Sequence, residues 1–85
     1  MIELTPAQRK YLRSQAHHLD PVVMIGKNGL TDEVVRSAEK ALAALELIKV
    51  RFQDREDEKR ALTDALAERT GAGVAGLIGH VAILY

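Results

Sequence analysis

The chain has 85 residues, in which twelve Lys and Arg balance twelve Asp and Glu, and it contains no cysteine. The balanced charge argues against a binder that works by bulk positive charge. The lack of cysteine excludes disulfides, thiol nucleophiles and thiolate metal sites. Neither an apolar run of about 18 residues nor a secretory leader pattern is visible, so we expect no membrane insertion or export, and a cytoplasmic protein. One small domain over residues 1–85 is expected.

The first predicted element is a basic helix that begins at Thr5 and ends near His18. Thr5 and Gln8 have the spacing of a capping box, and Pro6 fits the first turn because its missing N–H has no helical partner there. One side of this helix carries a basic stripe with no acid among its residues, made of Arg9, Lys10, Arg13 and His17. The stripe is either a solvated face or a contact for a polyanion, and in the second case we expect its cations to lie close to the glycine loop at residues 26–29.

The most informative segment is a loop, Gly26-Lys27-Asn28-Gly29, between a strand and a helix. Val22–Ile25 before it is an unbroken run of β-formers, which suits a strand covered on both faces. Glycine at both ends of the loop admits positive φ and removes side chains that would hold a ligand away from the main chain. Lys27 adds a mobile cation, and Asn28 adds an amide and tolerates a left-handed turn. The loop therefore suits a phosphodiester backbone; the alternative is a sharp turn without a ligand.

Thr31 marks the start of the second predicted helix, and Asp32 and Glu33 in its first turn already satisfy the positive end of the helix dipole. A phosphate at this corner would therefore be met by the amides of the loop and by Lys27. Leu47–Phe52 alternates apolar and basic residues, which predicts a second strand. Strand, helix and strand form a βαβ unit with parallel strands, so the loop and the Phe52–Arg55 connection should share one edge of the sheet.

A third helix is predicted from Asp54 to Gly71, and the acids of its first turn are explained by the helix dipole rather than by a metal. The last residues predict an antiparallel hairpin that turns around Gly79 and His80. Gly73 and Gly76 indicate that its first strand is short, bulged or closely approached by other backbone. The expected fold is α/β: a two-layer α-β-α-β-α-β-β domain with helices packed on a four-stranded mixed sheet.

Several motifs in this order resemble a known family. They are L-T-x-x-Q-x-x-x-L from Leu4, H-x-L-x-P-V-V-x-I-G-x-N-G-L-T from His17, E-L-I-K-V from Glu46, T-G-A from Thr70 and I-G-x-x-x-x-L-Y from Ile78. Together they resemble the CRM domain (chloroplast RNA splicing and ribosome maturation), and in particular the stand-alone bacterial YhbY-like proteins. The resemblance covers Leu4 to Tyr85.

The resemblance implies a fold similar to the C-terminal domain of translation initiation factor three, RNA binding, and a part in assembly of the large ribosomal subunit. It implies RNA contact by the loop residues Gly26, Lys27, Asn28 and Gly29, by the helix residues Arg9, Lys10 and Arg13, and by Lys49 and Arg51 in the E-L-I-K-V segment. Two departures are visible: His80 stands where family members commonly carry a basic residue, and the sequence ends at Tyr85 without the family's basic tail.

Three classes of function follow from these residues. The first is a non-enzymatic, monomeric protein that binds structured ribosomal RNA, needs no metal or other cofactor and has no small-molecule substrate; the paucity of aromatics, two Tyr and one Phe, argues against reading of splayed bases. The second is a protein-interaction module that docks on a ribosomal protein without touching RNA. The third, an enzyme, is disfavoured because the loop fits neither phosphate-loop nor dinucleotide spacing and no nucleophile–base–acid set is visible.

Overall fold

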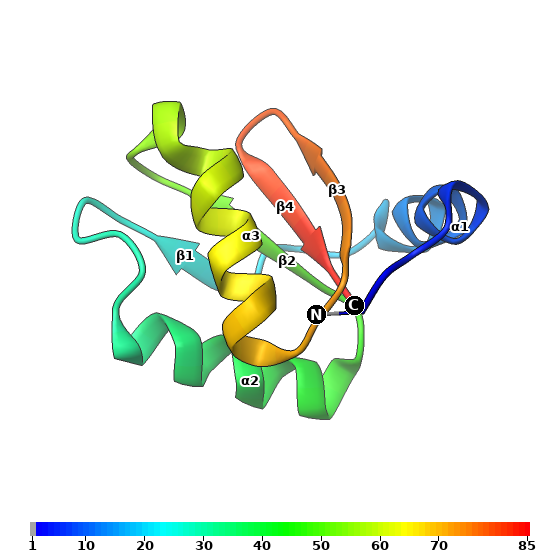
Figure 1. The fold of residues 1–85 in the computed structure, drawn as a ribbon, viewed down its shortest axis with the longest axis horizontal. Helices are drawn as coiled ribbons and strands as arrows, with labels where there is room; N and C mark the ends of the chain where they lie inside the picture. The colour runs from blue at the N-terminus through cyan, green and yellow to red at the C-terminus, as the bar shows by residue number, and fades with distance from the viewer. Residues whose placement is uncertain (1) are drawn as a thin grey trace.

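A computed structural model describes residues 2–85. Within these residues, three α-helices, a single 3₁₀ turn and four strands follow one another (Figure 1). Their bounds are α1 Pro6–Ala16, β1 Val23–Ile25, α2 Asp32–Leu45, β2 Ile48–Phe52, η1 Glu56–Glu58, α3 Lys59–Thr70, β3 Val74–Ile78 and β4 Val81–Leu84. The predicted order α-β-α-β-α-β-β is confirmed.

Local hydrogen bonds fix where the first two helices begin. At α1, the Thr5 hydroxyl accepts from the Gln8 amide (3.1 Å) while the Gln8 side chain accepts from the Thr5 amide (2.8 Å), so the predicted capping box is present. At α2, the Thr31 hydroxyl accepts from the Val34 amide at 3.2 Å. Helix α1 ends at Ala16, about half a turn before the predicted end at His18.

The strands form one mixed sheet in the order β1-β2-β4-β3. Strand β1 runs parallel to β2, with Ile25 opposite Phe52, and the predicted βαβ pairing is thereby confirmed. Strand β4 lies between β2 and β3 and is antiparallel to both. The β3–β4 turn contains Gly79 and His80, as predicted, and a register shift between Val74 and Gly76 is the expected bulge.

The helices cover both faces of the sheet, which corrects the expectation of two layers. Ala82 and Leu84 of β4 pack beneath α2 and α3, whereas Ile83 points to the other face and packs with Leu12 and Ala16 of α1. Successive strand residues point to opposite faces, so these two contacts place α1 across the sheet from α2 and α3. The layers therefore run helix, sheet, helix, within the predicted α/β class.

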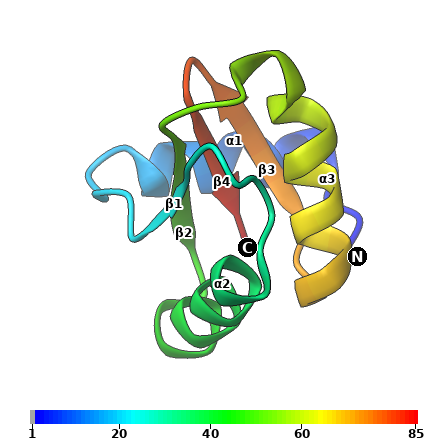
Figure 2. The same cartoon turned by 90° about the vertical axis from the view of Figure 1, so that its left-hand side faces the viewer.

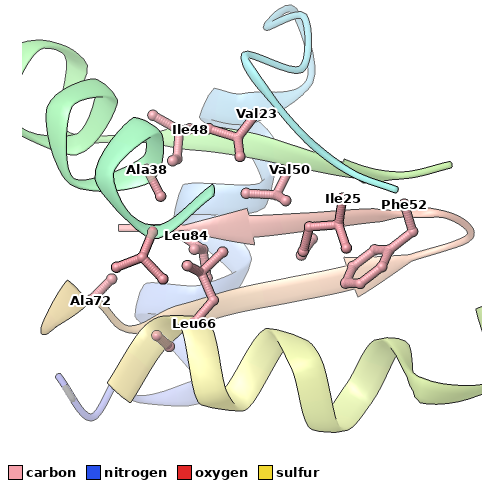
Figure 3. Close-up of a cluster of buried hydrophobic side chains, with 12 residues drawn as sticks. Val23, Ile25, Ala38, Ile48, Val50, Phe52, Leu66, Ala72 and Leu84 are labelled. Atoms are coloured by element: carbon pink, nitrogen blue, oxygen red, sulfur yellow. The ribbon is translucent and has the colours of Figure 1, made fainter. Parts of the chain in front are cut away.

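The larger core lies between the sheet and the pair α2 and α3 (Figure 3). Ile25, Val50 and Leu84 are 0% exposed there, and Phe52 closes the end of the core nearest the loop. Burying each such side chain contributes about 1.5–3 kcal/mol. The core anchors the ends of β1 and β2, and hence the start of the loop that follows β1.

Strand β1 is covered on one face only, which corrects the expectation of coverage on both. Val23 and Ile25 point into the core, but Met24 between them is 42% exposed. Because β1 is an outer strand and α1 lies over β3 and β4, none of the helices within residues 2–85 reaches the face that Met24 occupies. An unbroken apolar run thus marks a half-covered strand here.

The third helix also begins later than predicted. Asp54 does not cap it; its Oδ1 accepts from the Arg55 amide at 2.7 Å. Arg55 then adopts a left-handed conformation (φ 57°), the 3₁₀ turn η1 follows, and α3 begins at Lys59. It ends at Thr70 with Gly71 as its left-handed C-cap (φ 76°), as predicted. Within residues 2–85, none of the helices combines the length and apolar character needed to cross a membrane.

Thr63 on α3 generates a prediction about stability. Its side chain is 1% exposed, and its hydroxyl has no hydrogen-bond partner among residues 2–85. Replacing an unpaired buried hydroxyl with a methyl group of similar shape removes a desolvation cost. We expect Thr63→Val to raise the free energy of unfolding by about 1 kcal/mol, measured by urea denaturation.

Thr70 provides the matched control, because its hydroxyl donates to the Leu66 carbonyl at 2.8 Å. The same substitution there, Thr70→Val, should lower the free energy of unfolding by about 1 kcal/mol. If Thr63→Val leaves the free energy of unfolding unchanged, or lowers it as Thr70→Val should, the unpaired hydroxyl of Thr63 does not carry a cost.

Candidate functional site

The Gly26–Gly29 loop is a tight turn at the carboxyl end of β1. The Gly29 amide donates to the Gly26 carbonyl at 3.0 Å, and Gly29 has a positive φ of 69°. Lys27 and Asn28, at the tip, are both exposed. The tip is thus open to solvent and is held by the turn beneath it.

Two backbone donors remain free in this turn. Within residues 2–85, the amides of Lys27 and Asn28 have no backbone or side-chain acceptor. A Cβ added to Gly26 would meet no atom within 4 Å, so the space in front of this glycine is empty. Unpaired amides beside an open approach and a lysine are the arrangement that binds an oxyanion.

Arg55 contacts this loop, although no sequence motif marks it as a functional residue. Its Nε donates to the Lys27 carbonyl at 2.7 Å, and a Cβ on Gly29 would lie only 3.3 Å from the same nitrogen. Gly29 is therefore needed both for its positive φ and for the close approach of Arg55. The predicted shared edge of the loop and the Phe52–Arg55 connection was the available signal, and the structure confirms it.

The residues around Arg55 carry charges of both signs. Arg55 Nη1 contacts Glu58 Oε1 at 3.1 Å, and His80 Nδ1 contacts Glu56 Oε1. Lys59 Nζ donates to the Gly79 carbonyl at 2.7 Å, which ties the start of α3 to the β3–β4 turn. Arg55 is therefore already paired with an acid of the protein, and Lys59 already donates to a backbone carbonyl.

A second feature is the open face of the sheet, which we define as the part of the α1 side that α1 leaves uncovered, formed by Met24, Lys49, Arg51, Ile78 and Val81. Across it, Met24 lies opposite Arg51, Arg51 opposite Val81, and Val81 opposite Ile78. Within residues 2–85, the four strands contain two charged residues, Lys49 and Arg51, and no acid. Both cations point to the open face because their neighbours Ile48, Val50 and Phe52 point into the core.

Lys49 connects the open face to α1. Lys49 of β2 lies opposite Ile83 of β4, and Ile83 lies opposite Gly76 of β3. A Cβ on Gly76 would lie 2.7 Å from Arg13 Cδ, so the side chain of Arg13 passes directly over this glycine. Strands lie about 4.8 Å apart, and Lys49 and the crossing Arg13 are therefore separated by about 10 Å on the same face.

The arginines of α1 line a groove of about 680 Å³ beside the outer edge of β3. Arg13 Nη1 donates to the Ala75 carbonyl at 3.1 Å, and Arg9 Nη1 donates to the Leu4 carbonyl at 2.7 Å. Arg60 from α3 lines the same groove and is paired loosely with Asp64 (3.8 Å). Each α1 arginine commits one donor to the backbone, so these side chains hold the helix as well as line the groove.

The expectation that α1 cations lie beside the loop is wrong. The loop follows β1 and α1 packs on β3, and these are the two outer strands of the sheet. Figure 1 places the loop and α1 at opposite ends of the longest axis, and Figure 2 shows the loop in front with α1 behind the strands. Lys10 lies exposed on α1, at the same end as Arg9 and Arg13. Lys49 and Arg51 therefore lie between two distant sets of predicted RNA-binding residues, those of the loop and those of α1.

Within residues 2–85, no group of three or more His, Asp or Glu residues is placed to hold a metal ion.

Comparisons with known proteins agree with this architecture. The family model of the CRS1/YhbY (CRM) domain matches residues 4–85. A Haemophilus influenzae protein named "RNA-binding protein" is 42% identical over 100% of this chain and 87% of its own length. A Bacillus subtilis protein named "Probable RNA-binding protein YqeI" is 39% identical over 96% of this chain and 86% of its own length.

A solved structure shows that the likeness extends to the fold. The solution structure of a Staphylococcus aureus protein aligns with a TM-score of 0.86 at 37% identity, and covers 98% of this chain and 88% of that one. A family match over nearly the whole chain, relatives near 40% identity and the shared fold lead to one assignment. The chain belongs to the CRS1/YhbY (CRM) domain family.

Proposed function

We propose that this protein binds structured RNA across the open face of the sheet, with the Gly26–Gly29 loop at one end and α1 at the other. The observation that carries the proposal is the distribution of charge: Lys27, Arg51, Lys49 and Arg13 follow one another across the molecule, and the strands between them carry no acid within residues 2–85. The names of the relatives, which refer to RNA binding, support the same ligand.

Contacts to phosphate supply the affinity in this proposal. Lys27 and the free amides of the loop bind one phosphate group, while Arg51 and Lys49 bind others on the sheet. The sheet offers no exposed aromatic ring of its strands for stacking splayed bases within residues 2–85, since Phe52, the aromatic residue of the strands, is 2% exposed. Recognition of shape and backbone, as in double-stranded or folded RNA, therefore suits this surface better than reading of single-stranded bases.

The proposal extends to the cellular role that the resemblance implies. We infer that the RNA is ribosomal, that the protein acts in assembly of the large ribosomal subunit in the cytoplasm, and that it acts as a monomer without catalysing a reaction. The groove beside Arg9, Arg13 and Arg60 gives a long folded RNA a second point of contact. An RNA with rigid, extended structure can reach both ends of a molecule whose longest extent is 33 Å.

One observation favours a second candidate, docking on a ribosomal protein. Three apolar side chains on or next to the open face are unusually exposed: Val22 (49%), Met24 (42%) and Ile78 (60%). Exposed apolar groups grouped on one surface are typical of protein interfaces. Capture of a ribosomal protein that survives ribonuclease treatment would favour this candidate over RNA binding.

The loop is tested by Lys27→Ala and Gly26→Asp. Neither residue packs against the core, and Gly26 has open space in front of it, so both variants should fold with unchanged thermal stability. Each should weaken binding to ribosomal RNA several-fold. For Lys27→Ala, the slope of log affinity against log salt should fall in magnitude by about 0.9, the value for one lost phosphate contact.

Lys40→Ala is the matched control for the loop, because Lys40 is an exposed lysine on the outer side of α2. Its affinity for RNA should equal that of the wild type. Salt-independent binding by the wild type, or an equal loss in the Lys40 and Lys27 variants, would contradict a phosphate site at the loop.

The open face is tested by two substitutions that separate the two candidates. Arg51→Gln removes a cation next to Met24, whereas Ile78→Ser removes an exposed apolar group in the same row. RNA binding predicts a several-fold loss of affinity for ribosomal RNA with Arg51→Gln and little change with Ile78→Ser, measured by fluorescence anisotropy. If instead Ile78→Ser abolishes capture of a ribosomal protein and Arg51→Gln does not, this face docks on protein rather than on RNA.

A further inference from the structure

Arg55 lies against the loop that the proposed function assigns to RNA, yet its role is not explained by the fold. Its side chain is 40% exposed, its Nε is bonded to the Lys27 carbonyl, and it lies directly over Gly29. Its backbone is left-handed (φ 57°), a conformation that non-glycine residues rarely adopt and that costs free energy unless other contacts hold it. The residue is held in an unfavourable backbone state that directs a cation to the loop.

The guanidinium of Arg55 has N–H groups that its contacts within the protein do not use. It presents five N–H groups in a planar fork. Nε is taken by Lys27, and Nη1 by the carboxylate of Glu58, at 3.1 Å to one oxygen and 3.5 Å to the other. Among residues 2–85, Nη2 has no acceptor. A phosphate group offers the same oxygen geometry as a carboxylate to this fork, so the edge that Glu58 occupies is also one that a phosphodiester can occupy.

We propose that Arg55 is a phosphate-binding residue of the loop, and that Glu58 occupies its guanidinium until RNA replaces it. The inference rests on the proposed RNA binding. In this exchange the Nε bond to the Lys27 carbonyl remains and keeps the guanidinium beside the free amides of Lys27 and Asn28. Glu58 is released to solvent, and the phosphate takes its place on Nη1 and Nη2.

Exposure makes the exchange feasible. The side chain of Glu58 is 47% exposed, and an ion pair between two solvated groups one turn apart is weak because water and salt screen it. A phosphate held at once by Arg55, Lys27 and two backbone amides has more partners than the carboxylate of Glu58 has. Glu58 therefore lowers the affinity for RNA without preventing binding.

Among the acids of this segment, Glu58 is the one paired with the side chain of Arg55 within residues 2–85. Asp54 accepts from the Arg55 amide, and Glu56 is paired with His80. Asp57 is exposed and, among residues 2–85, forms no ion pair. Asp57 is thus a control for the general effect of one negative charge near the loop.

The experiment is a double-mutant cycle with a mixed-sequence RNA hairpin that has a stem of about 16 base pairs, the span of a double-stranded RNA-binding domain. Glu58→Gln should tighten binding by about two- to five-fold, the range that an exposed ion pair allows. Asp57→Asn should change it less than Glu58→Gln does. Arg55→Lys, which keeps the charge and loses the fork, should weaken binding, and adding Glu58→Gln in that background should recover little.

The outcomes separate this inference from the proposed function. If Lys27→Ala weakens binding but Glu58→Gln does not tighten it, or tightens it equally in the Arg55→Lys background, Glu58 does not act through Arg55 and the inference fails alone. An equal gain from Asp57→Asn would also overturn it, because general repulsion then explains the effect. If the wild type does not bind the hairpin, both proposals fall. If Lys27→Ala has no effect, the loop is no RNA site, and the inference falls together with the loop's part of the proposed function. Thermal unfolding of each variant checks that Arg55→Lys is folded, and Glu58→Gln alone still decides the question if it is not.

Discussion

The parallel pairing of β1 with β2 determines which residues can meet the Gly26–Gly29 loop. Because the two strands end at the same edge, the segment after β2 passes beside the loop, and the Gln53 amide bonds to the Ile25 carbonyl there (2.8 Å). The β3–β4 turn reaches the same edge, where the His80 carbonyl accepts from the Phe52 amide at 2.7 Å. Three chain segments distant in sequence are thus fixed around one small turn, and Arg55 bonds to it across 28 positions of sequence.

The fold places the basic residues of the strands and the acidic residues of the 3₁₀ segment on different parts of the surface. A net charge of zero hides a sheet whose strands hold two cations and no acid, beside a 3₁₀ segment made of three acids. The acids of that segment are not spread at random around the loop, since two of them pair with Arg55 and His80. Local pairing at the edge and unopposed cations on the open face allow a neutral protein to present a surface for a polyanion.

Much of the fold could be predicted because its determinants are local. The capping residues Thr5 and Thr31 make hydrogen bonds within one turn, and the spacing of strand, helix and strand leaves few topologies. The side of the sheet on which α1 packs could not be read from α1, whose apolar residues fit either face. The signal was in β4, where Ala82, Ile83 and Leu84 are consecutive and apolar, as in a strand buried on both sides.

The candidate site was predictable in part for the same reason. The loop and its shared edge with the segment after β2 follow from topology, whereas the left-handed Arg55 does not, because Asp54–Glu58 has the composition of a helix start. The remote position of Arg9 and Arg13 depends on the packing of α1, and nothing in the stripe of basic residues specifies that packing. Whether these residues bind RNA stays a prediction.

The unequal size of the two cores has a consequence for the energetics of the chain. Among residues 2–85, twelve buried residues form the core between the sheet and the pair α2 and α3, and four form the core under α1. The attachment of α1 also includes the Arg13 side chain over Gly76. Regions with fewer buried apolar contacts open at a lower free-energy cost, so α1 should open more readily than the rest of the domain. A partner that touches both parts favours the docked form of α1, and part of its binding free energy is then spent on closing the first helix onto the sheet.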